Sequence, residues 1–256
     1  MKVWLVKYKL SMTAKNDGAT SASRLALQTA IITAIIGPVV LLVAQHFLEP
    51  RLIEHTKESI STVTVSDDRI RELFRSLLLV ETHHGGRATG FLLAPNLRFV
   101  VSAVNLASDV NEPATVIRLK GSSDEITDSG HVSVIDKETM LAFVDMGKKL
   151  APEFALSMAK SDVKSLDKIF TIGYARGNFP VLREGRIASL DYKLESRRFI
   201  SADLPWEPGM AGSPVFDKSG QVIGVLSAGF PDSSIAVITP ITQVLQSLEK
   251  LGNQYQ

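Results

Sequence analysis

The pattern of hydrophobic and polar positions separates an apolar segment near the N-terminus from a longer part made of short runs. Residues 25–48 (LALQTAIITAIIGPVVLLVAQHFL) contain no Asp, Glu, Lys or Arg, and about 20 consecutive apolar residues suffice to cross the hydrocarbon layer of a membrane. Apolar side chains cover every face of this segment rather than one stripe, which disfavours a buried helix of a soluble domain. We therefore predict a transmembrane helix at residues 25–48.

The charges that flank this segment predict its orientation. Residues 1–24 carry five basic side chains and one acidic side chain, whereas the residues directly after the segment mix both signs. Because cytoplasmic flanks are enriched in Lys and Arg, we expect residues 1–24 to form a cytoplasmic tail and the rest to lie across the membrane. A cleaved signal peptide is the alternative. Its apolar region would be shorter and would end at a small-x-small site, unlike Val43-Ala44-Gln45-His46 here.

Residues 49–76 are predicted to form a stalk followed by a short lead-in helix. Residues 49–64 have mixed charge and no strong apolar period. Ser66, Asp67 and Asp68 then supply a capping residue and an acidic first turn, which favour a helix N-terminus. The apolar residues that follow at helical spacing are Ile70, Leu73, Phe74 and Leu77.

Residues 77–256 have the texture of an all-β domain. Turn signals such as Ala94-Pro95-Asn96 separate short β-type runs, and many short strands with no long helices between them are typical of an antiparallel barrel or sandwich. The runs are Leu77–Thr82, Gly90–Leu93, Phe99–Ala103, Ala114–Leu119, Val132–Ile135, Leu141–Val144, Lys168–Ile172 and Val222–Ser227. Apolar residues after Pro240 recur at helical spacing and predict an amphipathic C-terminal helix.

Composition excludes several classes of protein. A chain of 256 residues with 45% apolar side chains can bury one sizeable core, and its net charge of +1 gives no reason to expect a nucleic-acid partner. It has no cysteine, so disulfides, thiolate metal sites and a cysteine nucleophile are excluded. Neighbouring residues of a strand point to opposite faces, so His83 and His84 are not expected to share a metal ion. We expect neither a metal nor another cofactor.

Three motifs carry a resemblance to a known family. Residues 208–214 (PGMAGSP) resemble the nucleophile loop of trypsin-like serine proteases, Gly-x-Ser-Gly-(Gly/Ser)-Pro, with Ala211 at the serine position. Residues 100–105 (VVSAVN) are similar to Val-Val-Thr-Ala-Ala-His of bacterial HtrA-like members, with Asn105 at the histidine position. Residues 136–144 (DKETMLAFV) are similar to a segment ending Asp-Leu-Ala-Val-Leu, with Met140 at the aspartate position. Further segments agree in the same order, namely Thr89–Leu93, Ile172–Gly177, Glu184–Ser189 and Asp203–Gly209.

The resemblance spans about residues 77 to 251 and has implications for fold and chemistry. It implies a mainly β fold of two six-stranded antiparallel β-barrels with a C-terminal helix, here preceded by one transmembrane helix. It also implies that the triad positions hold Asn105, Met140 and Ala211. A methyl group cannot attack a carbonyl, an amide does not take up a proton near neutral pH, and a thioether has no charge. Loss of a triad costs on the order of a million-fold in rate, so we expect no catalytic residues.

Two features of the family's binding cleft are kept. By resemblance, the backbone N–H groups of Gly209, Met210 and Ala211 form the oxyanion hole. The strand residues that correspond to the family's substrate-pairing edge are Leu226, Ser227, Ala228 and Gly229. Together they would hold an extended peptide or protein partner by strand addition. The alternative is that both features survive because the barrel itself needs them.

The sequence therefore predicts a single-pass membrane protein whose protease-like domain is extracytoplasmic, and periplasmic if the source is bacterial. Our leading hypothesis is a trypsin-like pseudoprotease that acts as a peptide- or protein-binding scaffold or regulator. Two alternatives remain: an active HtrA-like endopeptidase with unconventional catalytic residues, and a structural subunit of a membrane complex. The resemblance also leaves open a homo-oligomer.

Overall fold

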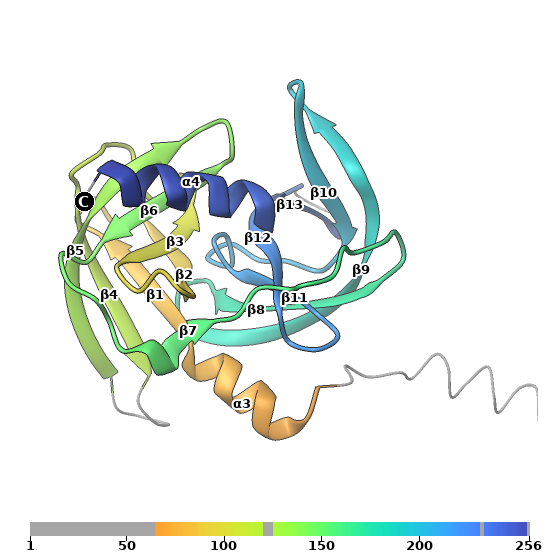
Figure 1. Ribbon diagram of the computed structural model, residues 1–256, viewed down its shortest axis with the longest axis horizontal. Coiled ribbons are helices and arrows are strands. Elements are labelled where there is room, and N and C mark those ends of the chain that lie inside the picture. Colours follow the sequence, from red (N-terminus) through yellow and green to blue (C-terminus); the bar gives the residue numbers. More distant parts are fainter. Residues whose placement is uncertain (1–64, 120–124, 231–232, 255–256) are drawn as a thin grey trace, which may run out of the picture. The chain divides into compact units, whose positions relative to one another are not determined.

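The computed structural model of the chain describes residues 65–119, 125–230 and 233–254 (Figure 1). The cytoplasmic tail predicted at 1–24, the transmembrane helix predicted at 25–48 and the stalk predicted at 49–64 lie outside the described residues. In the part that is described, no helix combines the length and the apolar character needed to span a bilayer.

The first half of the described chain forms a six-stranded antiparallel barrel. Its strand order is β1-β4-β5-β6-β3-β2, and direct pairing of β1 with β2 closes the ring. A short strand, β7, adds parallel to β2. The strands are β1 (Leu77–Thr82), β2 (Arg87–Leu93), β3 (Phe99–Ala103), β4 (Pro113–Leu119), β5 (Glu125–Asp136), β6 (Leu141–Asp145) and β7 (Ala155–Leu156).

The second half forms another closed antiparallel barrel, with the order β10-β13-β12-β11-β8-β9. Its strands are β8 (Lys168–Ala175), β9 (Phe179–Leu194), β10 (Arg197–Asp203), β11 (Pro214–Asp217), β12 (Val222–Gly229) and β13 (Ile235–Pro240). The ends of β9 and β10 extend beyond the barrel as a long hairpin (Figure 1). The predicted mainly β fold of two six-stranded barrels is therefore confirmed.

Two helices flank the barrels. Helix α3 (Asp67–Arg75) is capped by Ser66, whose side chain accepts a hydrogen bond from the N–H of Arg69. Leu73 is the fully buried residue of this helix. An acidic first turn complements the N-terminal end of the helix dipole. The predicted C-terminal helix is α4 (Ile241–Gln254), which packs against β12.

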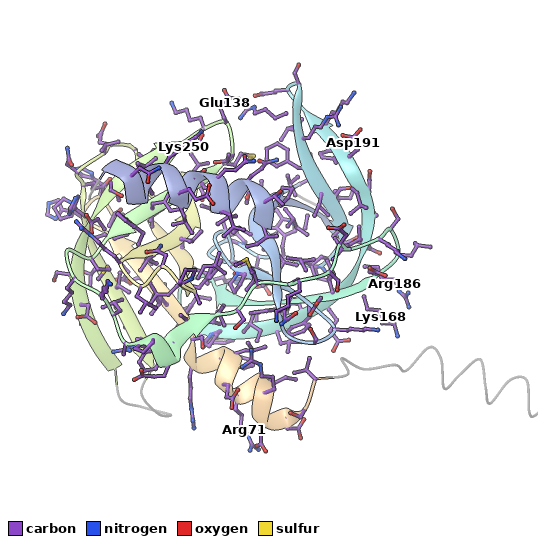
Figure 2. The ribbon with its side chains drawn as sticks, in the orientation of Figure 1. Arg71, Glu138, Lys168, Arg186, Asp191 and Lys250 are labelled. Atoms are coloured by element: carbon purple, nitrogen blue, oxygen red, sulfur yellow. The ribbon has the colours of Figure 1, made fainter. Side chains whose placement is uncertain are left out.

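The apolar residues form a core that passes from one barrel to the other. One buried cluster joins Phe91 and Phe143 of the first barrel with Phe170 and Phe216 of the second, whose rings stack with centroids 5.0 Å apart. Charged side chains such as those of Glu138 and Lys250 lie on the outside (Figure 2). This shared core supports the loops between the barrels from both sides, which is a requirement for a fixed site geometry.

Candidate functional site

The segment that resembles a nucleophile loop consists of two successive tight turns. In the first, the N–H of Met210 donates to the carbonyl of Glu207 at 3.0 Å. Pro208 occupies the second position of this turn and Gly209, with φ +91°, the third, which is the residue pattern of a type II turn. A Cβ on Gly209 would lie 2.5 Å from the carbonyl oxygen of Tyr174, so only glycine fits there.

The second turn brings Ala211 to the first barrel. The N–H of Ser213 donates to the carbonyl of Met210 at 3.0 Å, and Gly212 has φ +86°. The carbonyl of Ala211 accepts the N–H of Thr89 on β2 at 2.9 Å. Ser213 is wholly buried, and its hydroxyl donates to the Met210 carbonyl at 2.5 Å. This hydroxyl therefore holds the turn and is not presented at the surface.

The two turns use some of the backbone N–H groups of the loop and leave others without a hydrogen bond. The Met210 N–H is occupied by the Glu207 carbonyl, whereas the N–H groups of Gly209 and Ala211 have no hydrogen-bond partner among the described residues. The carbonyl of Pro208 accepts the N–H of Arg176 at 2.6 Å. Because a trans peptide directs its C=O and N–H to opposite sides, the Gly209 N–H points away from Arg176. Of the three N–H groups predicted to form an oxyanion hole, that of Met210 is occupied, and those of Gly209 and Ala211 have no partner in the described part of the chain.

Asn105 and Met140 are neighbours in the first barrel. Asn105 lies in a single 3₁₀ turn, η1 (Val104–Leu106), and is exposed. Met140 lies in the turn between β5 and β6 with φ +59°, and its carbonyl accepts the N–H of Val104 at 3.0 Å. Pairing of Ala103 with Leu141 continues this contact along β3 and β6.

Ala211 approaches the same region from the second barrel. A Cβ on its neighbour Gly212 would lie 2.0 Å from the carbonyl oxygen of Thr89, 2.6 Å from Ser102 Oγ and 3.0 Å from the N of Ala103. The loop thus packs against the end of β3, directly before η1. The structure gathers the backbones of the three triad-equivalent positions around this strand end, and none of the three side chains is ionisable.

Polar contacts tie the turn before Met140 to the second barrel. The hydroxyls of Ser227 and Thr239 lie 2.6 Å apart, and Thr239 Oγ1 donates to the carbonyl of Thr139 at 2.6 Å. At the tip of the β9–β10 hairpin, Arg197 pairs with Glu195 and donates to the carbonyl of Lys137. These contacts hold the position equivalent to the acid, although Met140 itself supplies no charge.

The predicted peptide-binding strand is partly open. Leu226 is buried. On the β11 side its carbonyl accepts the N–H of Gly212 at 2.7 Å, and its own N–H donates to the carbonyl of Ser213 at 2.9 Å. Beyond Leu226, Ala228 and Gly229 pair with β13 on one side, and the described residues supply no strand partner on the other. The edge of β12 that has no second strand partner is therefore Ser227–Gly229, while Leu226 is bonded to the loop around Gly212.

Trp206 fills the space beside the end of this edge. A Cβ on Gly229 would lie 2.0 Å from Cε2 of the Trp206 ring. The indole is half-buried and packs against the apolar cluster of the second barrel. Trp206 therefore packs along one side of the region between the Ala211 loop and β12.

One acid–histidine pair was not predicted. Glu112 is buried, and its Oε1 accepts the backbone N–H of His84 and lies 3.0 Å from His84 Nδ1. The hydrogen bond from the His84 N–H holds the pKa of Glu112 below its ordinary value, against burial, which acts to raise that pKa. The other carboxylate oxygen has no partner in the described part of the chain. Because 28 residues separate the two, no local pattern could have indicated the pair.

The two adjacent histidines do not lie in a strand, so the strand geometry assumed for them is wrong. β1 ends at Thr82, and His83 and His84 form the turn before Gly85, with their rings in edge contact at a centroid distance of 5.6 Å. Gly85 has φ +85° and its N–H donates to the Thr82 carbonyl, so the glycine closes the turn. Within residues 65–119, 125–230 and 233–254, no group of three His, Asp or Glu side chains could hold a metal ion.

The fold and the loop geometry define the class of this protein. Residues 88–225 match the profile of the family described as the trypsin-like peptidase domain, and this match covers more than half of the chain. The chain belongs to the family of trypsin-like peptidase domains. A comparison with curated protein sequences finds no match.

Several solved structures share the fold. The inactive form of Rv3671c from M. tuberculosis H37Rv, a serine-to-alanine mutant, is 20% identical, with a TM-score of 0.59 over 75% of this chain and 94% of that chain. The active form of the same protease is 19% identical, with a TM-score of 0.60 over 72% and 84%. The structure of Deg5 is 22% identical, with a TM-score of 0.57 over 70% and 92%. The structural neighbours are thus HtrA- and Deg-type trypsin-like proteases, and at these identities the likeness establishes the fold alone.

Proposed function

We propose that this chain is a membrane-anchored, catalytically inactive trypsin-like protein that binds an extended peptide or a segment of a partner protein. The observation that carries the proposal is the identity of the residues at the three triad positions. Ala211 has no hydroxyl to attack a carbonyl, Asn105 takes up no proton near neutral pH, and Met140 has no charge to orient a base. Peptide hydrolysis by a serine mechanism needs all three functions.

Two features of the region between the Ala211 loop and β12 support peptide binding. The N–H groups of Gly209 and Ala211 have no partner among the described residues, and Ser227–Gly229 presents a strand edge that is free on one side. Backbone donors and a strand edge are the two elements with which a protein holds an extended chain by strand addition. They support binding without cleavage, because neither element requires a triad.

The membrane part of the proposal comes from the sequence. Residues 25–48 would anchor the protein as a single helix, with residues 1–24 in the cytoplasm and residues 77–256 on the other side of the membrane, periplasmic in a bacterium. Tethered in this way, a binding domain would act as a scaffold or regulator at the membrane surface.

A bulky side chain at position 211 tests binding in the cleft. We expect the full-length protein to bind fluorescein-labelled, unfolded casein, and Ala211→Phe to weaken this binding about ten-fold or more, equivalent to about 1.4 kcal/mol. Lys218→Phe places the same ring on the exposed turn between β11 and β12 and should leave binding unchanged. Equal binding by both variants, measured by fluorescence anisotropy, would reject the cleft as the binding site. Gly209 is unsuited to this test because any side chain there collides with Tyr174.

The second candidate function is hydrolysis through unconventional residues, and the observation that favours it is the pair of Glu112 and His84. A buried acid beside Nδ1 of an exposed imidazole is the arrangement that orients a general base. Against it, no serine or threonine hydroxyl of the described residues forms a hydrogen bond with His84. A base without a nucleophile or a positioned water does not make a protease.

Labelling by a fluorophosphonate probe separates the two candidates. We expect no labelling and no casein cleavage by the unmodified chain. The triple variant Asn105→His, Met140→Asp, Ala211→Ser should gain labelling, because it restores nucleophile, base and acid on the same backbone. Labelling of the unmodified chain that is lost in His84→Ala would reject the inactive protein and support the second candidate.

A further inference from the structure

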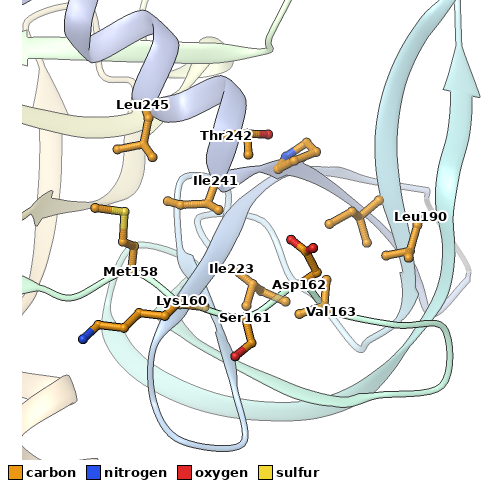
Figure 3. A pocket seen from close by; sticks show the side chains of 13 residues that line it. Met158, Lys160, Ser161, Asp162, Val163, Leu190, Ile223, Ile241, Thr242 and Leu245 are labelled. Carbon is orange, nitrogen blue, oxygen red and sulfur yellow. The ribbon is translucent and has the colours of Figure 1, made fainter.

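The second barrel contains a cavity that none of the triad-equivalent residues lines. It has a volume of about 380 Å³ and lies between the segment 158–163, the strands of the second barrel and the first turns of α4 (Figure 3). Its walls are mainly aliphatic, from Leu190, Ile200, Ile223, Ile241 and Leu245. A volume of a few hundred Å³ with apolar walls and few polar groups is typical of sites for small ligands or single side chains.

The floor of this aliphatic cavity is rigid, because two of its residues belong to the core. Ile200 on β10 is 4% exposed and Ile223 on β12 is 3% exposed. Both strands are paired on two sides within the closed barrel, so the floor is not free to collapse. An apolar group placed there would exchange water for contact with these side chains.

Two charged side chains line the aliphatic cavity, and they are placed differently. Figure 3 shows the carboxylate of Asp162 turned toward the space between Ile241 and Leu190, whereas Lys160 points away from it. Asp162 forms neither an ion pair nor a side-chain hydrogen bond with any described residue. Both side chains are exposed, and the one that is turned toward the cavity is the carboxylate of Asp162.

A second cavity of about 410 Å³ adjoins the first and shares Ser161, Asp162 and Val163 with it. Its lining is mostly polar and includes acidic and basic side chains, those of Asp167, Asp217, Lys168 and Lys218. The segment 161–163 thus forms a wall between an aliphatic and a polar space. Asp162 stands where a ligand's apolar part would end and its polar part would begin.

We propose that the aliphatic cavity binds a linear aliphatic ammonium ion, the chemistry shared by a free alkylamine and by a lysine side chain. The methylene chain would lie against the isoleucine and leucine walls, and the ammonium group would pair with Asp162. A carboxylate of the same length would bring its charge to Asp162 and is disfavoured. Each methylene buried should tighten binding about four-fold, from the transfer free energy of a buried CH₂. This site is independent of the proposed function.

Calorimetric titration of the full-length protein at neutral pH tests the proposal. We expect n-hexylammonium to bind more tightly than n-butylammonium, and at least five-fold more tightly than hexanol or hexanoate. Asp162→Asn should remove the preference for the ammonium over the alcohol. Thr242→Trp, an exposed residue that lines the cavity, should abolish binding, whereas Lys250→Trp, exposed on the same helix outside the lining, should not.

A further titration identifies the source of the ammonium ion, and a second cavity-filling variant controls for misfolding of the first. If N-acetyl-lysine N-methylamide binds more tightly than n-butylammonium, the ligand is a lysine side chain of a peptide. If it binds more weakly, the ligand is a free amine. Ala159→Leu fills the cavity from a second side and should repeat the loss seen with Thr242→Trp. Equal affinity for hexylammonium and hexanol, tighter binding of hexanoate, or unchanged binding by both filled variants would each overturn the proposal.

Discussion

The indole of Trp206 lies directly on the α-carbon of Gly229, so that a Cβ at position 229 would come within 2.0 Å of the ring. Gly229 is the last residue of the open edge of β12, and its φ lies outside the left-handed region. The absence of a side chain there is therefore a requirement of the ring and not of the backbone. The size of the residue at 206 sets the space beside the strand edge.

This contact predicts a coupling between the two positions. Gly229→Ala should lower the free energy of unfolding by about 1–3 kcal/mol, because it overpacks the site. In the background of Trp206→Ala the same substitution should cost almost nothing, so the two changes should be strongly non-additive. Urea unfolding of the four proteins measures the coupling free energy. Additive effects would mean that the ring moves aside freely.

Two glycines with the same type of backbone conformation predict very different costs of substitution. Gly212 has φ +86° and a Cβ there would meet the Thr89 carbonyl at 2.0 Å, whereas Gly147 has φ +65° and nothing within 4 Å of the added Cβ. Gly147→Ala should therefore lower stability by about 1 kcal/mol, the strain of the left-handed conformation alone. Gly212→Ala should cost at least about 3 kcal/mol or prevent folding, since the backbone of β2 must also move.

Thermal or urea unfolding of both glycine variants provides the measurement. Gly147 serves as the matched control, because the change in chain entropy on adding a methyl group is the same at both positions. Similar losses for the two variants would show that the loop around Ala211 can shift away from β2. In that event the positions of the N–H groups of Gly209 and Ala211 would not be fixed by packing.

The loop around Ala211 illustrates what can be predicted from sequence. Its first turn follows from a local rule, because proline at the second position and glycine at the third favour a type II turn. The first turn of α3 follows in the same way from Ser66 and its acidic neighbours. These features depend on residues adjacent in the chain, so short-range patterns contain the information.

Features that depend on distant residues could not be predicted in this way. The resemblance indicates only Glu184–Ser189 of β9 (Phe179–Leu194). The apolar pattern alone does not show this strand, because exposed charged residues such as Glu184 and Arg186 interrupt its apolar positions. The strand geometry expected for His83 and His84 is wrong, because the chain turns there, directly before Gly85-Gly86. The contact between Glu112 and His84 depends on the pairing of β1 with β4, which no local pattern determines.

The ion pair of Arg98 and Asp145 predicts a pH-dependent contribution to stability. Arg98 donates twice to the buried carboxylate, at 2.7 Å each, and Gly147 N–H donates at 2.8 Å. These contacts, those from Arg98 first, hold the pKa of Asp145 below its ordinary value. A depressed carboxyl pKa stabilises the fold above the unfolded pKa of about 4, and this stability is lost as pH falls further.

Replacing Arg98 should remove the stability that the Asp145 carboxylate contributes at neutral pH and make its charged form unfavourable. Arg98→Met leaves the Asp145 carboxylate buried without its cation and should cost about 2–3 kcal/mol at pH 7. The cost should shrink as the pH is lowered toward 4, because protonation removes the uncompensated charge. Arg71→Met breaks the exposed pair with Asp68 and should change stability by less than about 0.5 kcal/mol at either pH. Urea unfolding at pH 4.5 and 7 gives both differences, and a pH-independent cost would contradict the assignment.

The contact between Glu112 and His84 predicts how the turn after β1 responds to acid. The depressed pKa of Glu112 means that its carboxylate stabilises the fold above about pH 4, and that this contribution disappears as the group is protonated. Glu112→Gln keeps an oxygen acceptor for the His84 N–H but removes the charge, so it should cost about 1–2 kcal/mol at pH 7.

The cost of Glu112→Gln relative to the unmodified chain should shrink as the pH falls below about 4 and through the lowered pKa of Glu112, because protonation makes that side chain neutral as well. Glu249→Gln, an exposed residue of α4, should be indistinguishable from the unmodified chain across the same range. Amide hydrogen exchange at His84 adds a local readout, because loss of the charge-assisted bond should speed exchange of that N–H while leaving the core strands protected. Unchanged exchange at His84 together with unchanged stability at pH 7 would show that the buried carboxylate is held by other contacts, and the pair would then have no part in fixing the turn.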